Sequence, residues 1–181
     1  MNIVLTEIEG CFILEPRVFN DGRGYFYESY NKNTFKAVTG LDVNFVQDNQ
    51  SFSSKGVLRG LHYQIGDAAQ AKLVRVVQGA VIDVAVDLRR GSATFGKHVA
   101  VELSADNKRQ LFVPRGFAHG FVVLSDEAEF AYKCDNFYSK EHERGVIYND
   151  AQLNIDWKFA GADLLVSEKD AILPALADAE Y

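Results

Sequence analysis

The chain has 181 residues, a length typical of one domain with a substantial core, and we expect residues 1–181 to form a single domain. Its 19 Lys and Arg against 25 Asp and Glu give a net charge of −6, which argues against a nucleic-acid binder or an acidic-membrane binder, because such proteins carry a net basic surface. The 48% hydrophobic and 24% charged residues exclude disorder as the main state.

The first segment, MNIVLTEIEG, carries glutamates where a signal peptide would be apolar, and no run approaches ~18 apolar residues. Cys11 and Cys134 are too few for a disulfide scaffold and form no Cys-x-x-Cys pair, which favours a reducing compartment. We therefore expect a soluble cytoplasmic protein without membrane contact.

The segments that follow read mainly as strands. A short helix is expected only at 33–38 and after Ser167, which could cap a segment that ends before Pro174. From Lys72 the run KLVRVVQGAVIDVAVDLRRG predicts two strands joined by a tight turn at Gln78-Gly79. The segments HVAVELS, QLFVPRG, HGFVVLS and EFAYKCDNFY continue at even spacing. This pattern predicts an all-β protein, a jelly-roll sandwich or barrel with a few short peripheral helices.

Alternation along these strands predicts which side chains share a face. In the strand from Ala80, Ile82, Val84, Val86 and Leu88 take one face, and a mixed set takes the other: Val81, Asp83, Ala85 and Asp87. In EFAYKCDNFY, Tyr132 and Tyr138 share a face if the strand is continuous, and they then stand roughly 20 Å apart.

The segment VPRGFAHGF has the form Pro-x-Gly-x-x-His and resembles the second motif of the cupin jelly rolls. In metal-binding cupins that histidine joins a His-x-His and a Glu from an earlier motif to hold a metal. Here His62 stands alone, with Gln64 where the second histidine would fall, and His98 and His142 lie in unrelated contexts. We therefore expect no metal site.

Several spaced segments together resemble the dTDP-4-dehydrorhamnose 3,5-epimerase family nearly end to end. They are RGYFYESY from Arg23, FVQDN from Phe45, VLRGLHYQ from Val57, KLVRV from Lys72, FVPRGFAHGF from Phe112, EFAYKCDNFY from Glu129 and SEKDA from Ser167. The resemblance implies a homodimeric cupin-type jelly roll without metal or organic cofactor. It further implies inversion of carbons 3 and 5 of dTDP-4-dehydro-6-deoxy-D-glucose to give dTDP-4-dehydro-L-rhamnose for cell-envelope polysaccharide.

This reaction needs a base, an acid and a partner for an oxyanion, because both carbons flank the 4-keto group and lose their protons through an enolate. The resemblance implies His62 as the base and Asp170 as the carboxylate that orients it; Asp83, on the mixed strand face, is a second candidate orienter. Lys72 would stabilise the oxyanion and Tyr132 would deliver a proton to the opposite face. The non-catalytic alternatives are a structural role for His62, a solvent-exposed position for Lys72 and a place in the hydrophobic core for Tyr132.

The remaining residues that match the family are assigned to substrate binding. Tyr138 would stack on the thymine, and guanidinium or ammonium groups suit the two phosphates. The cationic positions are Arg23, Arg59, Lys72 and Lys169, and the others are Glu28, Gln47, Asp48, Asn49, His119 and Glu143. Any anionic ligand would need such a local cluster, because the whole chain is acidic.

Four other functions fit parts of the pattern. A mono-epimerase or a ketoisomerase acting on a related dTDP-4-keto-6-deoxy sugar would keep the histidine base, although Tyr132 favours epimerisation. A non-catalytic cupin that binds a sugar nucleotide would need none of the acid and base residues. A metal-dependent dioxygenase would need a metal site.

Overall fold

The computed structural model describes residues 1–181, apart from the side chain of Ala162. The strands are β1 (Asn2–Leu5), β2 (Phe12–Glu15), β3 (Val18–Asp21), β4 (Gly24–Tyr27), β5 (Gln47–Ser54), β6 (Val57–Gln64), β7 (Lys72–Gln78), β8 (Ala80–Asp87), β9 (His98–Ser104), β10 (Gln110–Val113), β11 (Phe117–Val123), β12 (Glu127–Cys134), β13 (Glu143–Gly145) and β14 (Leu165–Val166). The α-helices are α1 (Lys32–Thr39) and α2 (Glu168–Ala171), and the short 3-10 helices are η1 (Gly66–Ala68), η2 (Lys140–His142), η3 (Gly161–Asp163) and η4 (Leu176–Asp178).

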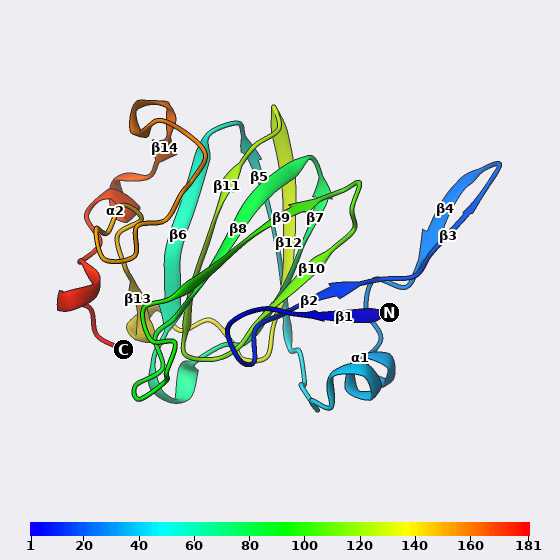
Figure 1. Cartoon of the computed structure of the whole chain (residues 1–181), viewed down its shortest axis with the longest axis horizontal. Coiled ribbons are helices and arrows are strands. Elements are labelled where there is room, and N and C mark those ends of the chain that lie inside the picture. The colour runs from blue at the N-terminus through cyan, green and yellow to red at the C-terminus, as the bar shows by residue number, and fades with distance from the viewer.

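Strands β5 to β12 form a jelly roll, as the sequence predicts. Strand β5 pairs with β12, β6 with β11, β7 with β10 and β8 with β9, all antiparallel, so the second half of this stretch folds back along the first. From β5 to β8 and again from β9 to β12, successive strands alternate between two sheets, ordered β1-β2-β10-β7-β12-β5 and β13-β6-β11-β8-β9 (Figure 1). The turn at Gly79 therefore joins two strands of different sheets rather than a hairpin.

A hydrophobic core fills the space between the two sheets. The inward side chains of β8 are those of the mixed face, with Val81 and Ala85 packed in this core and Asp83 fully buried nearby. Ile82, Val84, Val86 and Leu88 point to the other side of the sheet, into a second cluster. The alternation predicted for this strand is thus confirmed, and two acidic residues of β8 lie inside the sandwich.

The outer faces of both sheets are covered by other segments. The C-terminal part of the chain packs Val146, Leu153 and Trp157 over the outer face of the sheet that contains β6 and β8. Helix α1 packs Phe35 against the outer face of the other sheet, beside Phe112. The C-terminal segment is the one that carries β14 and α2 (Figure 1), so this packing brings distant sequence next to β6.

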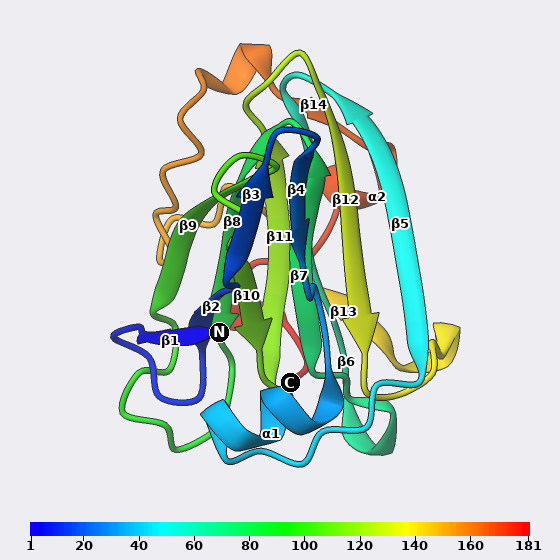
Figure 2. The same cartoon turned by 90° about the vertical axis from the view of Figure 1, so that its right-hand side faces the viewer.

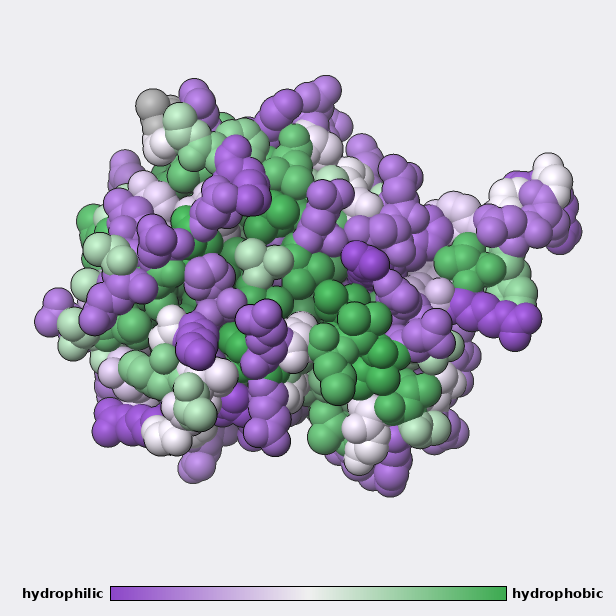
Figure 3. All heavy atoms as spheres, in the orientation of Figure 1, coloured by the Kyte–Doolittle hydropathy of each residue, from purple (hydrophilic) through white to green (hydrophobic). Residues whose placement is uncertain are grey.

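Strands β3 and β4 form a two-stranded hairpin that pairs with neither main sheet. This hairpin, residues 18–27 and hereafter the arm, projects from the body of the molecule (Figure 1) and lies in front of the body in the view of Figure 2. Phe19 and Phe26 are registered partners on one side of it and remain 50% and 72% exposed. Figure 3 shows hydrophobic surface on the arm and a larger patch where β1 crosses the molecule; Ile3, Val4 and Leu5 are exposed there.

The predicted helix and helix cap are confirmed, whereas one predicted strand is too long. The expected helix at 33–38 lies within α1, and Ser167 caps α2 by accepting a hydrogen bond from the Asp170 amide at 3.1 Å. The strand expected through Tyr138 ends at Cys134, so Tyr132 and Tyr138 do not share one continuous strand. Neither α-helix in the described chain has the length and apolar character needed to cross a membrane.

Candidate active site

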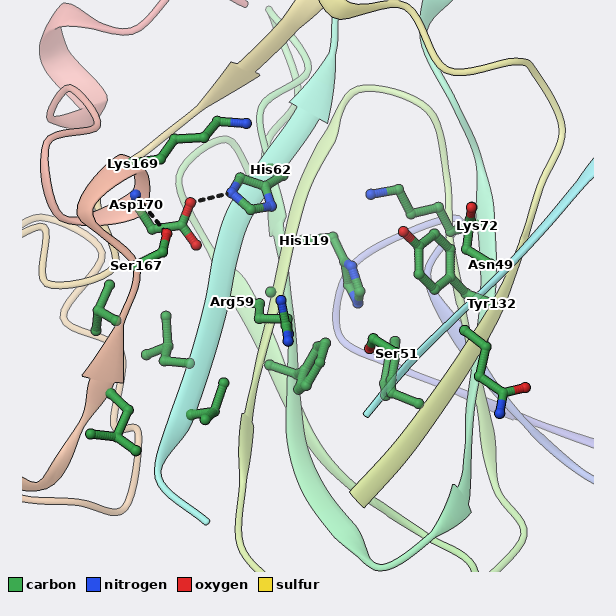
Figure 4. A pocket seen from close by; sticks show the side chains of 18 residues that line it. Asn49, Ser51, Arg59, His62, Lys72, His119, Tyr132, Ser167, Lys169 and Asp170 are labelled. Atoms are coloured by element: carbon green, nitrogen blue, oxygen red, sulfur yellow. Dashed lines mark hydrogen bonds and ion pairs between the residues drawn. The ribbon is translucent and has the colours of Figure 1, made fainter. Parts of the chain in front are cut away.

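A cavity of about 670 Å³ opens between the two sheets of the jelly roll. One wall comes from β5, β7 and β12 and the other from β6 and β11, while β14 and α2 close one side (Figure 4). Its lining combines histidine, lysine, arginine, tyrosine and aspartate side chains with a few apolar ones. Such a mixture of charged, polar and apolar side chains is typical of a ligand-binding pocket and not of a packed hydrophobic core.

A β-bulge in β6 turns the side chains of Arg59 and His62 into this cavity. His119 of β11 pairs with His62, and Phe121 pairs with Arg59. The two positions are two residues apart on β11 but three apart on β6, so β6 contains one extra residue. In a regular strand, residues three apart point to opposite faces. Because of the extra residue, Arg59 and His62 both line the cavity.

Two glycines allow β6 and β11 to approach closely at the bulge. A Cβ added to Gly60, whose φ is +123°, would lie 2.6 Å from the Cα of Gly120. A Cβ on Gly120 would lie 2.7 Å from the carbonyl oxygen of Arg59. Larger side chains would push the strands apart, so the orientation of Arg59 and His62 depends on these two glycines.

The imidazole of His62 is held by the carboxylate of Asp170. Nε2 of His62 lies 2.7 Å from Oδ1 of Asp170, and Oδ2 accepts the Gly60 amide at 3.2 Å. Because an ionised carboxylate only accepts, Nε2 carries the hydrogen and Nδ1 keeps a lone pair. Burial would raise the pKa of Asp170, but the hydrogen bond from His62 and the Gly60 amide lower it below the ordinary aspartate value.

The second candidate orienter, Asp83, is bonded to another histidine. Nε2 of His119 lies 3.1 Å and 3.0 Å from the two carboxylate oxygens of Asp83. Both side chains are buried, and the His119 ring packs 6.0 Å from that of Phe130. Asp170 is therefore the hydrogen-bonded partner of His62, while Asp83 holds His119 in the cavity wall.

Tyr132 lies across the cavity from His62, on the opposite sheet (Figure 4). Its neighbours in the sheet are Asn49 of β5 and Val74 of β7. Burial raises the pKa of the Tyr132 phenol, so the hydroxyl stays protonated to higher pH than a free tyrosine. A histidine and a protonated phenol thus face the same space from two sides.

Lys72 brings an ammonium beside Tyr132. Its Nζ lies 5.8 Å from the centre of the Tyr132 ring, and within the described residues no carboxylate pairs with it. Burial lowers the pKa of Lys72, while the nearby Cys134, Asp83 and Glu143 act in the opposite direction. A lysine in this position can meet negative charge that develops on a bound molecule.

Polar groups of β5 and β6 line the cavity beside these residues. Asn49 points inward, where its amide contacts Cys134 Sγ at 3.7 Å and accepts from Gln47 at 3.1 Å. Arg59 is exposed to the cavity and donates to Ser53 Oγ at 3.1 Å. Its guanidinium has free donors for a phosphate group.

A cluster at the side of the cavity that carries His62 consists of Tyr138, Glu143 and Lys169. The Tyr138 hydroxyl and Lys169 Nζ both donate to Oε2 of Glu143, at 3.1 Å and 2.7 Å. Burial would raise the pKa of Glu143, but these two donors lower it, and the Glu143 carboxylate raises the pKa of Lys169. Of the three, Lys169 lines the cavity, and Tyr138 is 54% exposed.

Three of the predicted binding residues lie away from the cavity of their own chain. Asp48 follows the opposite face of β5 from Asn49 and forms an ion pair with Lys133 at 2.9 Å. Arg23 is on the arm, where it pairs with Asp21, and Glu28 accepts hydrogen bonds at the start of α1. The cavity lining thus brings together His62, Lys72, Tyr132, Asp170, Asn49, Arg59, His119 and Lys169, but not these three. Gln47, Tyr138 and Glu143 are not part of the lining either, although hydrogen bonds connect them to Asn49 and Lys169.

Several lining residues were not anticipated from the sequence. Ser51 shares the inward face of β5 with Asn49, so strand alternation could have identified it. Leu165 and Val166 of β14 line the wall because β14 pairs with β6 in parallel, and no local pattern indicates that pairing. Ser167 was anticipated only as a helix cap.

Gln64, at the place of a second metal-binding histidine, serves the backbone instead. Its amide donates to the carbonyl of Ala68 at 2.7 Å and accepts from the amide of Ser139 at 2.6 Å. Within the described residues, no group of three or more His, Cys, Asp or Glu side chains could hold a metal ion. His142 is bonded to Ser139 outside the cavity lining.

The arrangement can remove a proton on one side of a bound molecule and supply one on the other. Nδ1 of His62 is the basic atom, the Tyr132 hydroxyl is the acidic one, and Lys72 lies beside the phenol. Such a site suits chemistry at a carbon next to a carbonyl group, where an enolate oxygen needs a cation.

Comparison with known proteins identifies the family. A sequence profile for dTDP-4-dehydrorhamnose 3,5-epimerase matches residues 5–178. The dTDP-4-dehydrorhamnose 3,5-epimerase of Shigella flexneri is 57% identical over 181 residues, covering 100% of this chain and 99% of the relative.

Two solved structures agree with this match. The dTDP-4-dehydrorhamnose 3,5-epimerase from Elizabethkingia anophelis NUHP1 superposes with a TM-score of 0.96 at 60% identity, covering 100% of this chain and 99% of that one. The dTDP-6-deoxy-D-glucose-3,5-epimerase from Legionella pneumophila, in complex with dTDP-4-keto-L-rhamnose, has a TM-score of 0.94 at 50% identity and coverages of 98% and 93%. This chain, an isomerase, belongs to the dTDP-4-dehydrorhamnose 3,5-epimerase family.

Proposed function

We propose that this protein inverts carbons 3 and 5 of dTDP-4-dehydro-6-deoxy-D-glucose to give dTDP-4-dehydro-L-rhamnose, without a metal ion or organic cofactor. The observation that carries the proposal is that His62 and Tyr132 line one cavity from opposite sheets, with Lys72 beside the phenol. Inversion needs a base on one face of the sugar and an acid on the other. A single group returning its own proton would restore the starting configuration.

The reaction runs through an enolate. Nδ1 of His62 takes the proton from the carbon next to the 4-keto group, and Asp170 stabilises the imidazolium that forms. The electron pair of the broken C–H bond forms the carbon–carbon double bond of the enolate, and the π pair of the carbonyl moves to the 4-keto oxygen, where Lys72 stabilises the negative charge. The Tyr132 hydroxyl then protonates the same carbon from the opposite face. His62 loses its proton to water and Tyr132 regains one before the second carbon reacts.

The nucleotide part of the substrate meets the polar groups around the cavity. Arg59 and Lys169 supply positive charge for the diphosphate, and the exposed Tyr138 ring offers a surface for the thymine. Asn49 and Gln47, linked to each other on β5, offer amides for hydroxyl groups or base edges. Local cations thereby hold a diphosphate on an acidic protein.

Arg23 and Glu28 enter the site of a second copy in a homodimer. Neither lines the cavity of its own chain, and the arm that carries Arg23 points away from the body (Figure 1). The arm also exposes Phe19 and Phe26, which a second copy would cover. Asp48, on the outer face of β5, would then lie near this contact rather than on the sugar. Free, buried Cys11 and Cys134 fit a cytoplasmic protein with a nucleotide-linked substrate.

Proton exchange with heavy water tests the mechanism. The purified protein, treated with a chelator and assayed for metal, is incubated with dTDP-4-dehydro-6-deoxy-D-glucose in D₂O and followed by NMR. We expect deuterium at carbons 3 and 5, abolished in His62→Ala; Tyr132→Phe should retain some exchange but lose inversion.

Each alternative function predicts a different result. Deuterium at one carbon indicates a mono-epimerase, a moved keto group indicates a ketoisomerase, and no exchange indicates a binding protein. Loss of activity on chelation, restored by a transition metal, would overturn the metal-free mechanism. Wild-type exchange in His62→Ala would remove this residue from the base role.

A further inference from the structure

A lysine from the jelly-roll body contacts the outer part of the arm. Nζ of Lys108 lies 3.9 Å from the centre of the Tyr25 ring and 5.9 Å from that of Tyr27, and it donates to the Ala105 carbonyl at 2.6 Å. Tyr25 and Tyr27 share one side of β4, with ring centres 6.0 Å apart. One ammonium thus bridges the arm and the β9–β10 turn.

The turn that carries Lys108 is fixed by its own hydrogen bonds. The side chain of Asn107 accepts from the amides of Ser104 and Arg109, at 3.1 Å and 2.9 Å, and donates to the carbonyl of Glu102 at 3.0 Å. Lys108 itself has a φ of 54°, a conformation uncommon for a residue other than glycine. The ammonium is therefore presented from a turn with little freedom to move.

Two further contacts join the end of the arm to the sheet. Arg75 NH1 donates to the Tyr27 hydroxyl at 3.2 Å, and the buried Gln110 donates to the Ser29 carbonyl at 2.7 Å. Both contacts lie at or beyond Tyr27. Of these body contacts, only that of Lys108 reaches Tyr25, two pairs of residues nearer to the tip.

The arm needs such support because it pairs with no other strand. An isolated two-stranded hairpin is marginally stable in water. Its opposite side exposes Phe19 and Phe26, and its tip carries Arg23, whose side chain is 91% exposed. Without a contact above Tyr27, this outer part would swing on its base.

We propose that Lys108 is a positioning residue that fixes the direction of the arm, and thereby delivers Arg23 to the nucleotide diphosphate in the site of the second copy. The inference rests on the proposed function, in which the arm serves a neighbouring subunit. The ammonium over the Tyr25 ring holds the arm in place before any substrate is present. This contact therefore reduces the conformational entropy that the arm would lose on substrate binding.

The test compares Lys108→Met with Lys97→Met in the full-length protein. Methionine keeps the length of the side chain and the backbone constraint at 108 but removes the charge. Lys97 is exposed and has no recorded side-chain partner among the described residues, which makes it the matched control. Hydrogen exchange of residues 18–27 is measured without substrate, and kcat and KM are measured with dTDP-4-dehydro-6-deoxy-D-glucose.

We expect faster exchange in the arm of Lys108→Met and a KM raised roughly three- to tenfold with kcat unchanged. Lys108→Arg, which can also place a cation over the ring, should show the exchange rate and the KM of the wild type. Unchanged exchange in Lys108→Met overturns the inference. So does an unchanged KM if Arg23→Ala raises KM.

Arg23→Ala separates this inference from the proposed function. If Arg23→Ala leaves KM unchanged, Arg23 does not serve the substrate, and both that part of the proposed function and the delivery of Arg23 by Lys108 fail. Faster exchange of the arm in Lys108→Met would then show only that Lys108 orders the arm. A raised KM in both variants supports both statements.

Discussion

His62 and His119 are registered partners on neighbouring strands, and both imidazoles line the same cavity, yet each is bonded to a different carboxylate. Asp170 reaches His62 from α2, whereas Asp83 reaches His119 from β8. The His62 side chain is 30% exposed and that of His119 only 7%. The two pairs therefore have different access to a bound molecule, and the first predictions concern their separate roles.

Asp170→Asn should lower kcat/KM by roughly 10²–10⁴, because an amide that donates to Nε2 would leave the hydrogen on Nδ1, the wrong nitrogen for a base. Deuterium uptake by the dTDP-linked keto sugar measures the effect directly. His142→Asn serves as the control, since His142 is bonded to Ser139 outside the cavity lining. Full exchange in Asp170→Asn would contradict the orienting role.

Lys72→Met should lower kcat by roughly 10²–10³ through loss of the oxyanion partner. Burial lowers the pKa of Lys72, so the ammonium loses its proton at a lower pH than a free lysine does. We therefore expect an alkaline limb in the pH profile, where activity falls as Lys72 becomes neutral. Lys72→Arg, if active, should move this limb to higher pH because a guanidinium stays charged. A pH profile of kcat measures both, and an identical alkaline limb in Lys72→Arg would assign it to another group.

Asp83→Asn should shift the alkaline limb of the pH profile to lower pH. The Asp83 carboxylate opposes the burial effect on Lys72, so its removal lowers the pKa of Lys72 further. It also weakens the bond to His119, which we expect to cost about 1–3 kcal/mol of unfolding free energy. Asp106→Asn, at an exposed position, is the control for the charge change. A profile equal to that of the control would show that Asp83 acts only through His119.

Asp87→Asn should lower the free energy of unfolding by about 3–5 kcal/mol at pH 7, because its buried carboxylate accepts hydrogen bonds from Arg89, Ser92 and Thr94. Burial would raise the pKa of Asp87, but these bonds lower it well below the usual range. The carboxylate thus contributes its stability above the unfolded-state pKa and loses it as pH falls towards the native one. The difference between variant and wild type should therefore shrink at low pH.

Urea unfolding at pH 7 and pH 3 measures this difference. Asp21→Asn is the matched control, because Asp21 bonds the amide and guanidinium of Arg23 in the same i, i+2 pattern on the exposed arm. We expect no measurable change there, since exposed ion pairs contribute little. Equal effects of the two variants would contradict the argument from burial.

Much of the fold follows from the sequence because strand alternation is a local property. The division of β8 into two faces needed only the alternation of positions such as Val81, Asp83 and Val84. The structure then shows that the face with the acidic residues is the inner one. The same rule would have assigned Asp48 and Asn49 to opposite faces of β5, as the structure has them. Where the strand is regular, spacing is sufficient.

The site itself depends on features without a local signal. Arg59 and His62 share a face only because β6 bulges at Gly60, and a spacing of three would otherwise separate them. The strand through Tyr132 ends at Cys134, so Tyr138 reaches the Glu143 cluster along a turn rather than a strand. These positions follow from pairing between distant segments, which a single sequence does not reveal.

The carboxylate that orients His62 comes from the last part of the chain. Strand β6 is made about a hundred residues before α2, and Asp170 reaches it only once β14 has paired with β6 and the C-terminal segment has packed over the sheet. A nascent or truncated jelly roll would hold the imidazole without its anion. The proposed catalytic use of His62 therefore depends on the docking of a segment about a hundred residues further along the chain.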